Sequence, residues 1–119
     1  MRALTAALLC LLALPASAQE RIFEFELDGM GFALPRPPDQ YIRAPYLAPR
    51  TLKYRDAEYV LKSCSLAIGK PEPLGCAVIA VPVFCTVLIN RDLPDDVQEM
   101  VLAHEDAHCR GWPADHPVD

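Results

Sequence analysis

Four cysteines in the second half of this chain restrict its fold more than any other feature: Cys64, Cys76, Cys85 and Cys109. An even number of cysteines in a small exported domain is typical of a disulfide framework. Four cysteines allow three pairings, and the sequence alone does not choose among them. If the segment between Cys76 and Cys85 is a hairpin, these two lie roughly opposite each other, which favours their pairing and leaves Cys64 to join Cys109.

Residues 1–18 have the composition of a secretory signal peptide. Arg2 is followed by the apolar run Ala6–Leu14, and Ala16-Ser17-Ala18 matches a small-x-small cleavage site. The apolar run is too short to span a bilayer, which requires roughly 20 residues. We therefore expect an exported protein, periplasmic or secreted, with no stable membrane anchor after cleavage.

Cleavage after Ala18 would leave 101 of the 119 residues, which is enough for one domain. We expect a single mature domain over residues 19–119, with an N-terminal part, 19–50, and a core, 51–119. The mature chain has 10 basic and 16 acidic residues, a net charge of −6. Because no basic cluster interrupts this balance, we expect no nucleic-acid partner.

The N-terminal part is predicted to be a strand followed by an extended segment. Residues 22–28 alternate between apolar and charged side chains, the pattern of a half-buried strand, and Gly29 ends it. The next segment, 34–49, is proline-rich, with prolines at 35, 37, 38, 45 and 49. Such a stretch is expected to contain neither a helix nor a central strand.

The core is predicted to contain two helices. Asp56 can cap the first, which runs to about Ala67 and is stopped by Gly69. Pro94 suits the first position of the second helix, and Gly111 follows its end.

Two short apolar segments, 76–80 and 83–89, lie between these helices and are rich in β-branched residues. They are predicted to form a hairpin, or one strand bent at Pro82. The chain is therefore expected to be an α+β domain with a small β-sheet, a preceding helix and a C-terminal helix.

The last helix carries the sequence His104-Glu105-Asp106-Ala107-His108. Residues four apart on a helix differ by about 40° and point the same way, so His104 and His108 can bind one metal ion. Glu105 lies about 100° round the helix, where its carboxylate can take a proton from a water that zinc activates. The pattern predicts a Zn²⁺ site with Glu105 as the catalytic base, and Asp106 as a solvated residue.

A third metal ligand must come from outside this helix. Gly111 lets the chain turn sharply, and His116 is the predicted third ligand, with Asp115 as its substitute. Three protein ligands and one open position are typical of catalytic zinc. Cys109 could also bind zinc, although an oxidising compartment favours a disulfide, and Trp112 is expected to cover the core rather than to bind substrate.

The segment His104-Glu105-x-x-His108-x-x-Gly111 resembles the start of the metzincin-type zinc signature of metallopeptidases. In that family the third ligand comes three residues after the glycine, at Ala114 here. Residues 56–116 also resemble small exported bacterial metallopeptidase-like proteins. The shared features are a Gly-Cys-Ala segment at 75–77, a later cysteine at 85, and a helix that ends His-Cys-x-Gly-Trp at 108–112.

This resemblance implies a zincin-like core that hydrolyses a peptide or protein substrate. By position, the strand Val83–Ile89 would hold the substrate backbone by strand addition. Two other interpretations stay open. The chain could be a catalytically inactive zincin-like module that binds metal or a protein, or a disulfide-stapled structural domain in which the two helix histidines only favour the negative end of the helix dipole.

Overall fold

The computed structural model describes residues 21–118, so the predicted signal peptide lies outside the described residues. The described part has an α+β fold, as predicted, with a two-stranded sheet, a three-stranded sheet and three helices. It forms two compact units, one up to Arg36 and one from Pro37 onward. A single mature domain over residues 19–119 stays a prediction.

The first unit is a β-hairpin. Strands β1 (Ile22–Leu27) and β2 (Met30–Pro35) pair antiparallel through the two-residue turn Asp28-Gly29. Both turn residues have positive φ, 50° and 78°, which is the geometry that a tight hairpin turn requires. The predicted strand is confirmed, while β2 was not predicted because its sequence lacks the alternation of β1.

The proline-rich segment contains one short helix, α3 (Gln40–Arg43), and the prediction that it contains none is wrong. Pro37 and Pro38 come just before Asp39, the N-cap of this helix, where a missing N–H removes no helical hydrogen bond. The helix then ends before Pro45. A single helical turn therefore fits between the prolines.

The second unit is built on a three-stranded sheet of order β3-β5-β4. Strand β3 (Arg50–Arg55) is parallel to β5 (Phe84–Asn90), and β4 (Gly75–Ala80) is antiparallel to it. The predicted hairpin is therefore confirmed, rather than a bent strand. β3 was not predicted because it is a mostly polar edge strand with few apolar residues.

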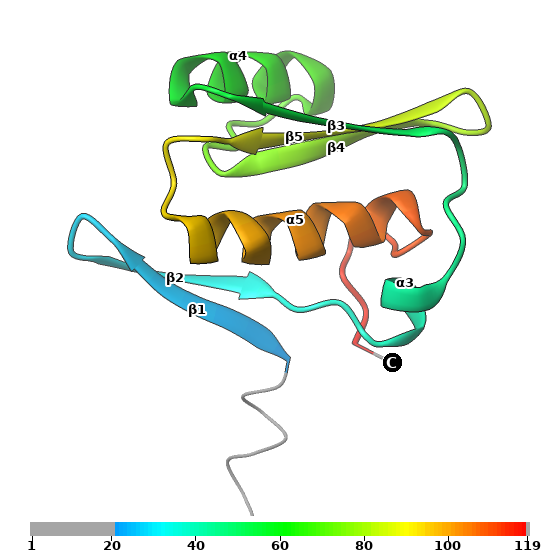
Figure 1. Cartoon of the computed structure of the whole chain (residues 1–119), viewed down its shortest axis with the longest axis horizontal. Helices are drawn as coiled ribbons and strands as arrows, with labels where there is room; N and C mark the ends of the chain where they lie inside the picture. The colour runs from blue at the N-terminus through cyan, green and yellow to red at the C-terminus, as the bar shows by residue number, and fades with distance from the viewer. Residues whose placement is uncertain (1–20, 119) are drawn as a thin grey trace, which may run out of the picture. The chain divides into compact units, whose positions relative to one another are not determined.

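Two helices cover the opposite faces of this sheet (Figure 1). Helix α4 (Ala57–Ile68) is capped by Asp56, whose side chain accepts a 2.8 Å hydrogen bond from the N–H of Tyr59. It ends at Gly69, where φ is 77°, so both predicted signals are confirmed. Helix α5 (Asp95–Cys109) begins one residue later than predicted, with Pro94 as its cap. No helix among residues 21–118 is both long and apolar enough to cross a bilayer.

Each helix is joined to its sheet face by one disulfide, Cys64–Cys76 for α4 and Cys85–Cys109 for α5. The predicted pairing of Cys76 with Cys85 and of Cys64 with Cys109 is wrong. In the hairpin register Cys85 lies opposite Ile79, three residues from Cys76. Because successive side chains alternate between faces, Cys76 and Cys85 project to opposite sides of the sheet. Neither can reach the other.

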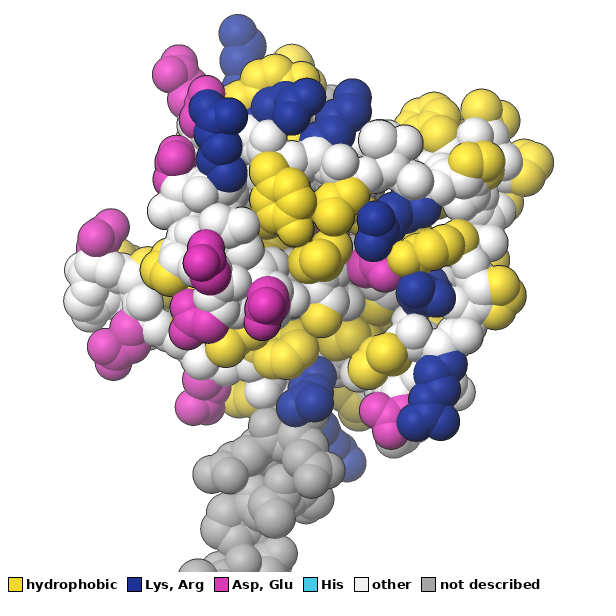
Figure 2. Space-filling view, viewed as in Figure 1, with side chains coloured by type: hydrophobic (Ala, Val, Ile, Leu, Met, Phe, Trp, Pro, Cys, Tyr) yellow, Lys and Arg dark blue, Asp and Glu magenta, His cyan; other side chains and the backbone are white. Residues whose placement is uncertain are grey.

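The turn between β4 and β5 carries exposed hydrophobic side chains. In Figure 2 hydrophobic side chains gather where Figure 1 places the end of this hairpin. Ile79, Val81, Val83 and Phe84 are all exposed there. In Figure 1 the turn extends beyond both covering helices, which explains their exposure.

The chain has no room for a side chain at Gly75, which is packed against β5 and α5. A Cβ atom at this position would lie 2.5 Å from the carbonyl oxygen of Leu88 and 3.0 Å from Cγ1 of Val101. Since the first obstacle is backbone, we expect Gly75→Ala to lower the free energy of unfolding by about 1–3 kcal/mol. Gly31→Ala is the control, because no heavy atom lies within 4 Å of a Cβ there. Urea denaturation of both variants measures the difference, and equal stabilities would contradict the close approach.

Candidate metal centre

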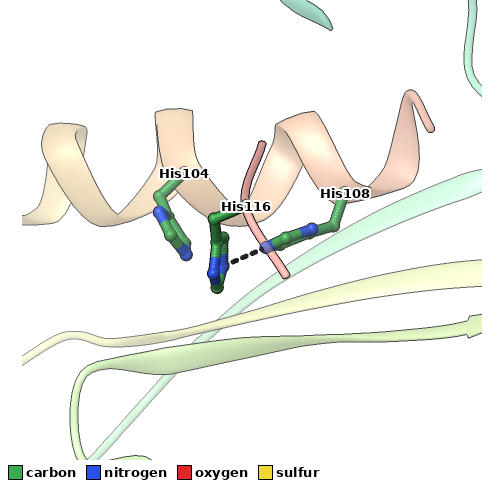
Figure 3. Close-up of side chains that lie close together, drawn as sticks. All are labelled: His104, His108 and His116. Carbon is green, nitrogen blue, oxygen red and sulfur yellow. Dashed lines mark hydrogen bonds between the residues drawn. The ribbon is translucent and has the colours of Figure 1, made fainter. Parts of the chain in front are cut away.

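Three histidines converge at the C-terminal half of α5 (Figure 3). His104 and His108 project from the helix, and His116 approaches from the C-terminal segment. One ring nitrogen of each lies within 4.8 Å of the others, and the Nε2 atoms of His108 and His116 are 3.1 Å apart. His104 is buried, with 4% of its surface exposed. The three predicted histidine ligands therefore form a group that could hold a metal ion.

A sharp turn after α5 returns the chain to the two helix histidines. The N–H of Gly111 donates to the carbonyl of His108 and the N–H of Trp112 to that of Ala107. Gly111 has φ of 103°, a conformation that favours glycine. His116 also has positive φ, 56°, which is uncommon for a residue with a side chain. Such backbone conformations are held by the surrounding structure and cluster at functional sites.

Burial disfavours the charged form of two of these histidines, His108 and His116. Nδ1 of His108 lies 2.7 Å from the carbonyl oxygen of Trp112, so it carries the proton, and the Nε2 atom that could bind a metal lies 3.1 Å from Nε2 of His116. Burial lowers the pKa of His108. Burial also lowers the pKa of His116, and the nearby charges of His108 and Lys70 act in the same direction. Neutral imidazole is the ligand form of histidine.

Glu105 directly follows His104 on α5 and is not a member of the histidine group. Its side chain is half-buried. Burial, reinforced by the negative charge of Glu72, raises its pKa to about 8. Lys70, which forms a 3.5 Å ion pair with Glu72, acts on both Glu105 and His116. The loop before β4 therefore contributes to the electrostatics of the site, a role that the sequence did not indicate.

The alternative ligands are outside the histidine group. Asp115 is exposed and is not a member of it, so His116 rather than its substitute completes the cluster. Cys109 is bonded to Cys85 and has no thiolate to offer. Trp112 is 2% exposed, as expected for a side chain that covers the core.

The strand predicted to bind substrate does not have a free edge. β5, which spans most of Val83–Ile89, is the central strand and pairs with β3 on one side and β4 on the other. Strand addition needs unpaired backbone N–H and C=O groups at a sheet edge. The interpretation of Val83–Ile89 as a substrate-binding strand is therefore wrong.

Asp106 links α5 to other parts of the chain through hydrogen bonds that the sequence did not predict. Its carboxylate accepts hydrogen bonds from Tyr46 Oη at 2.9 Å, from Arg50 Nε at 2.7 Å and from Arg110 Nε at 3.3 Å. The side chain of Asp106 is only 14% exposed, so its prediction as a solvated residue is wrong. These contacts tie α5 to Tyr46 in the segment before β3 and to Arg50, the first residue of β3.

Comparison of this chain with protein families, with curated proteins and with solved structures finds no match. The case for a function therefore comes from the geometry of the site itself.

Proposed function

We propose that this protein is an exported zinc-dependent hydrolase, a metallopeptidase in which Glu105 is the general base. One observation carries the proposal: three imidazoles from two segments bring nitrogens within 4.8 Å of one another. Glu105, the residue after His104, is half-buried on the same helix. A helix whose histidines only favoured the dipole would not draw His116 back to the same point.

Zinc is the metal that this set of ligands suits best. Zn²⁺ is bound by histidine nitrogens in tetrahedral sites, whereas Ca²⁺ and Mg²⁺ prefer oxygen ligands. Three histidines leave one tetrahedral position for water or substrate, the arrangement of a catalytic site. Among the described residues, the group of candidate ligands consists of histidines alone, which argues against the oxygen-binding ions.

The chain's own residues supply the proton transfers of hydrolysis. When bound, zinc would polarise the scissile carbonyl and make water more acidic. In its ionised form, Glu105 would accept a proton from the attacking water and return it to the departing nitrogen. The charges of Lys70 and Glu72 would act on Glu105 during this transfer. Asp106 would help to hold α5 in place during the reaction through its contacts with Tyr46 and Arg50.

Export is supported by the two disulfides, which are consistent with an oxidising compartment. Together with the predicted signal peptide, they support a periplasmic or secreted location. Both disulfides belong to the unit that carries the histidines, so the site would be assembled where the cysteines are oxidised.

A second candidate is a catalytically inactive zincin-like module that binds metal or a protein. The pairing of β5 on both sides favours it, because the strand expected to hold a peptide backbone is not available. This candidate has the same histidine group and predicts bound zinc without turnover.

Metal analysis and a peptide-library assay on the purified protein test the proposal. We expect one zinc ion per chain and cleavage of peptides that stops on addition of a chelator and returns with zinc. Bound zinc without cleavage of any peptide would favour the inactive module. Protein that stays metal-free after equilibration with excess zinc would overturn both interpretations.

A further inference from the structure

We infer that Trp112 is a positioning residue of the metal centre, and that its indole holds the third ligand in place. The inference rests on the proposed metal site but does not depend on the reaction that occurs there. It assigns Trp112 a role beyond covering the core.

The indole touches all three imidazoles. Its ring centroid lies 5.0 Å from that of His108, with an interplanar angle of 17°, so the two rings are stacked. The centroids of His104 and His116 lie 5.1 Å and 4.9 Å away, both in edge-on geometry. Because only 2% of its surface is exposed, Trp112 is shielded from water, and the three imidazoles pack against its indole.

Hydrogen bonds at both ends of Trp112 fix the ligand-bearing segments. Its backbone carbonyl accepts a hydrogen bond from Nδ1–H of His108, which orients that imidazole. Its indole Nε1–H donates a 2.8 Å hydrogen bond to the carbonyl of Pro117, the residue after His116. The second bond closes the C-terminal segment into a loop and so determines where His116 lies.

Two roles for Trp112 lead to different expectations. A side chain that only fills the core would contribute to folding stability and leave zinc affinity unchanged. A positioning residue would affect zinc affinity through the orientation of ligands that remain chemically intact. Losing an outer-shell residue that orients a metal ligand typically lowers metal affinity by about 10–100-fold.

Trp112→Phe separates these roles, because it keeps an aromatic ring and removes the N–H that holds Pro117. We expect its zinc affinity, measured by competition with a chelating dye, to fall by about 10–100-fold. Val60→Ala is the matched control. Val60 is fully buried on the opposite sheet face with Cys64 and Cys76, so its truncation should lower stability without changing zinc affinity.

The wild-type protein offers an independent measurement, because Trp112 is the only tryptophan in the chain. Zinc bound at the adjacent imidazoles should change its fluorescence and saturate at one ion per chain. Unchanged zinc affinity in Trp112→Phe, or zinc binding without a fluorescence change, would overturn the role of Trp112 alone. If Trp112→Phe does not fold, the wild-type titration decides. Failure of the wild-type protein to bind zinc would overturn this inference and the proposed function together.

Discussion

Glu105→Gln is expected to lower kcat/KM for peptide hydrolysis by about 10²–10⁴-fold, the usual contribution of a general base. The amide has nearly the same shape as the carboxylate but cannot accept a proton from water. Because Glu105 is not a member of the histidine group, zinc content should remain at one ion per chain. The loss should therefore appear in turnover while the metal is retained.

Glu99→Gln is the matched control for this substitution. Glu99 lies on the same helix, and its substitution by Gln makes the same change in charge and shape as Glu105→Gln. Unlike that of Glu105, the side chain of Glu99 is exposed. We expect wild-type activity and wild-type zinc content in this variant. Wild-type activity in Glu105→Gln would remove Glu105 from the mechanism, and loss of zinc in that variant would mean that its carboxylate supports the metal instead.

The parts of this structure that were predicted correctly depend on residues close together in the sequence. The cap at Asp56 and the stop at Gly69 act within one helical turn. The spacing of His104 and His108 sets their common direction through helix geometry alone. His116 could be added because Gly111 permits a sharp turn a few residues earlier.

The disulfide pairing could not be predicted because it depends on strand register. The sequence indicated a hairpin but not which residues face each other across it. A shift of one residue moves a side chain to the other face of the sheet, so a small error in register changes which helix a cysteine can reach. With the observed register, Cys76 faces α4 and Cys85 faces α5.

The contacts between α5 and residues far away in the chain could not be predicted, because no local sequence pattern indicates them. Asp106 bonds to Tyr46 and Arg50, which are 60 and 56 residues away in the chain. β3 is parallel to β5, and a parallel pairing needs a long connection that no turn motif marks. Both contacts require the tertiary arrangement of the sheet and α5 before they can be recognised.

His116→Ala is expected to lower zinc affinity by more than about 100-fold, beyond the usual effect of removing a residue that only orients a ligand. The variant leaves two imidazoles on α5, which cannot complete a three-ligand site. Zinc should then no longer stabilise the fold. In the wild-type protein, zinc at 100 times its dissociation constant should add about 2.7 kcal/mol to the free energy of unfolding.

Asp115→Ala distinguishes the ligand from its neighbour. Asp115 precedes His116 and is exposed outside the histidine group, so its removal should leave both zinc affinity and the zinc-dependent rise in Tm unchanged. Dye competition and thermal unfolding with and without zinc measure both quantities in each variant. The reverse result, with zinc lost in Asp115→Ala and retained in His116→Ala, would assign the third ligand to the carboxylate. Because zinc binding by the C-terminal segment depends on the fold of that loop, this pair of variants tests the geometry on which the proposed hydrolase rests.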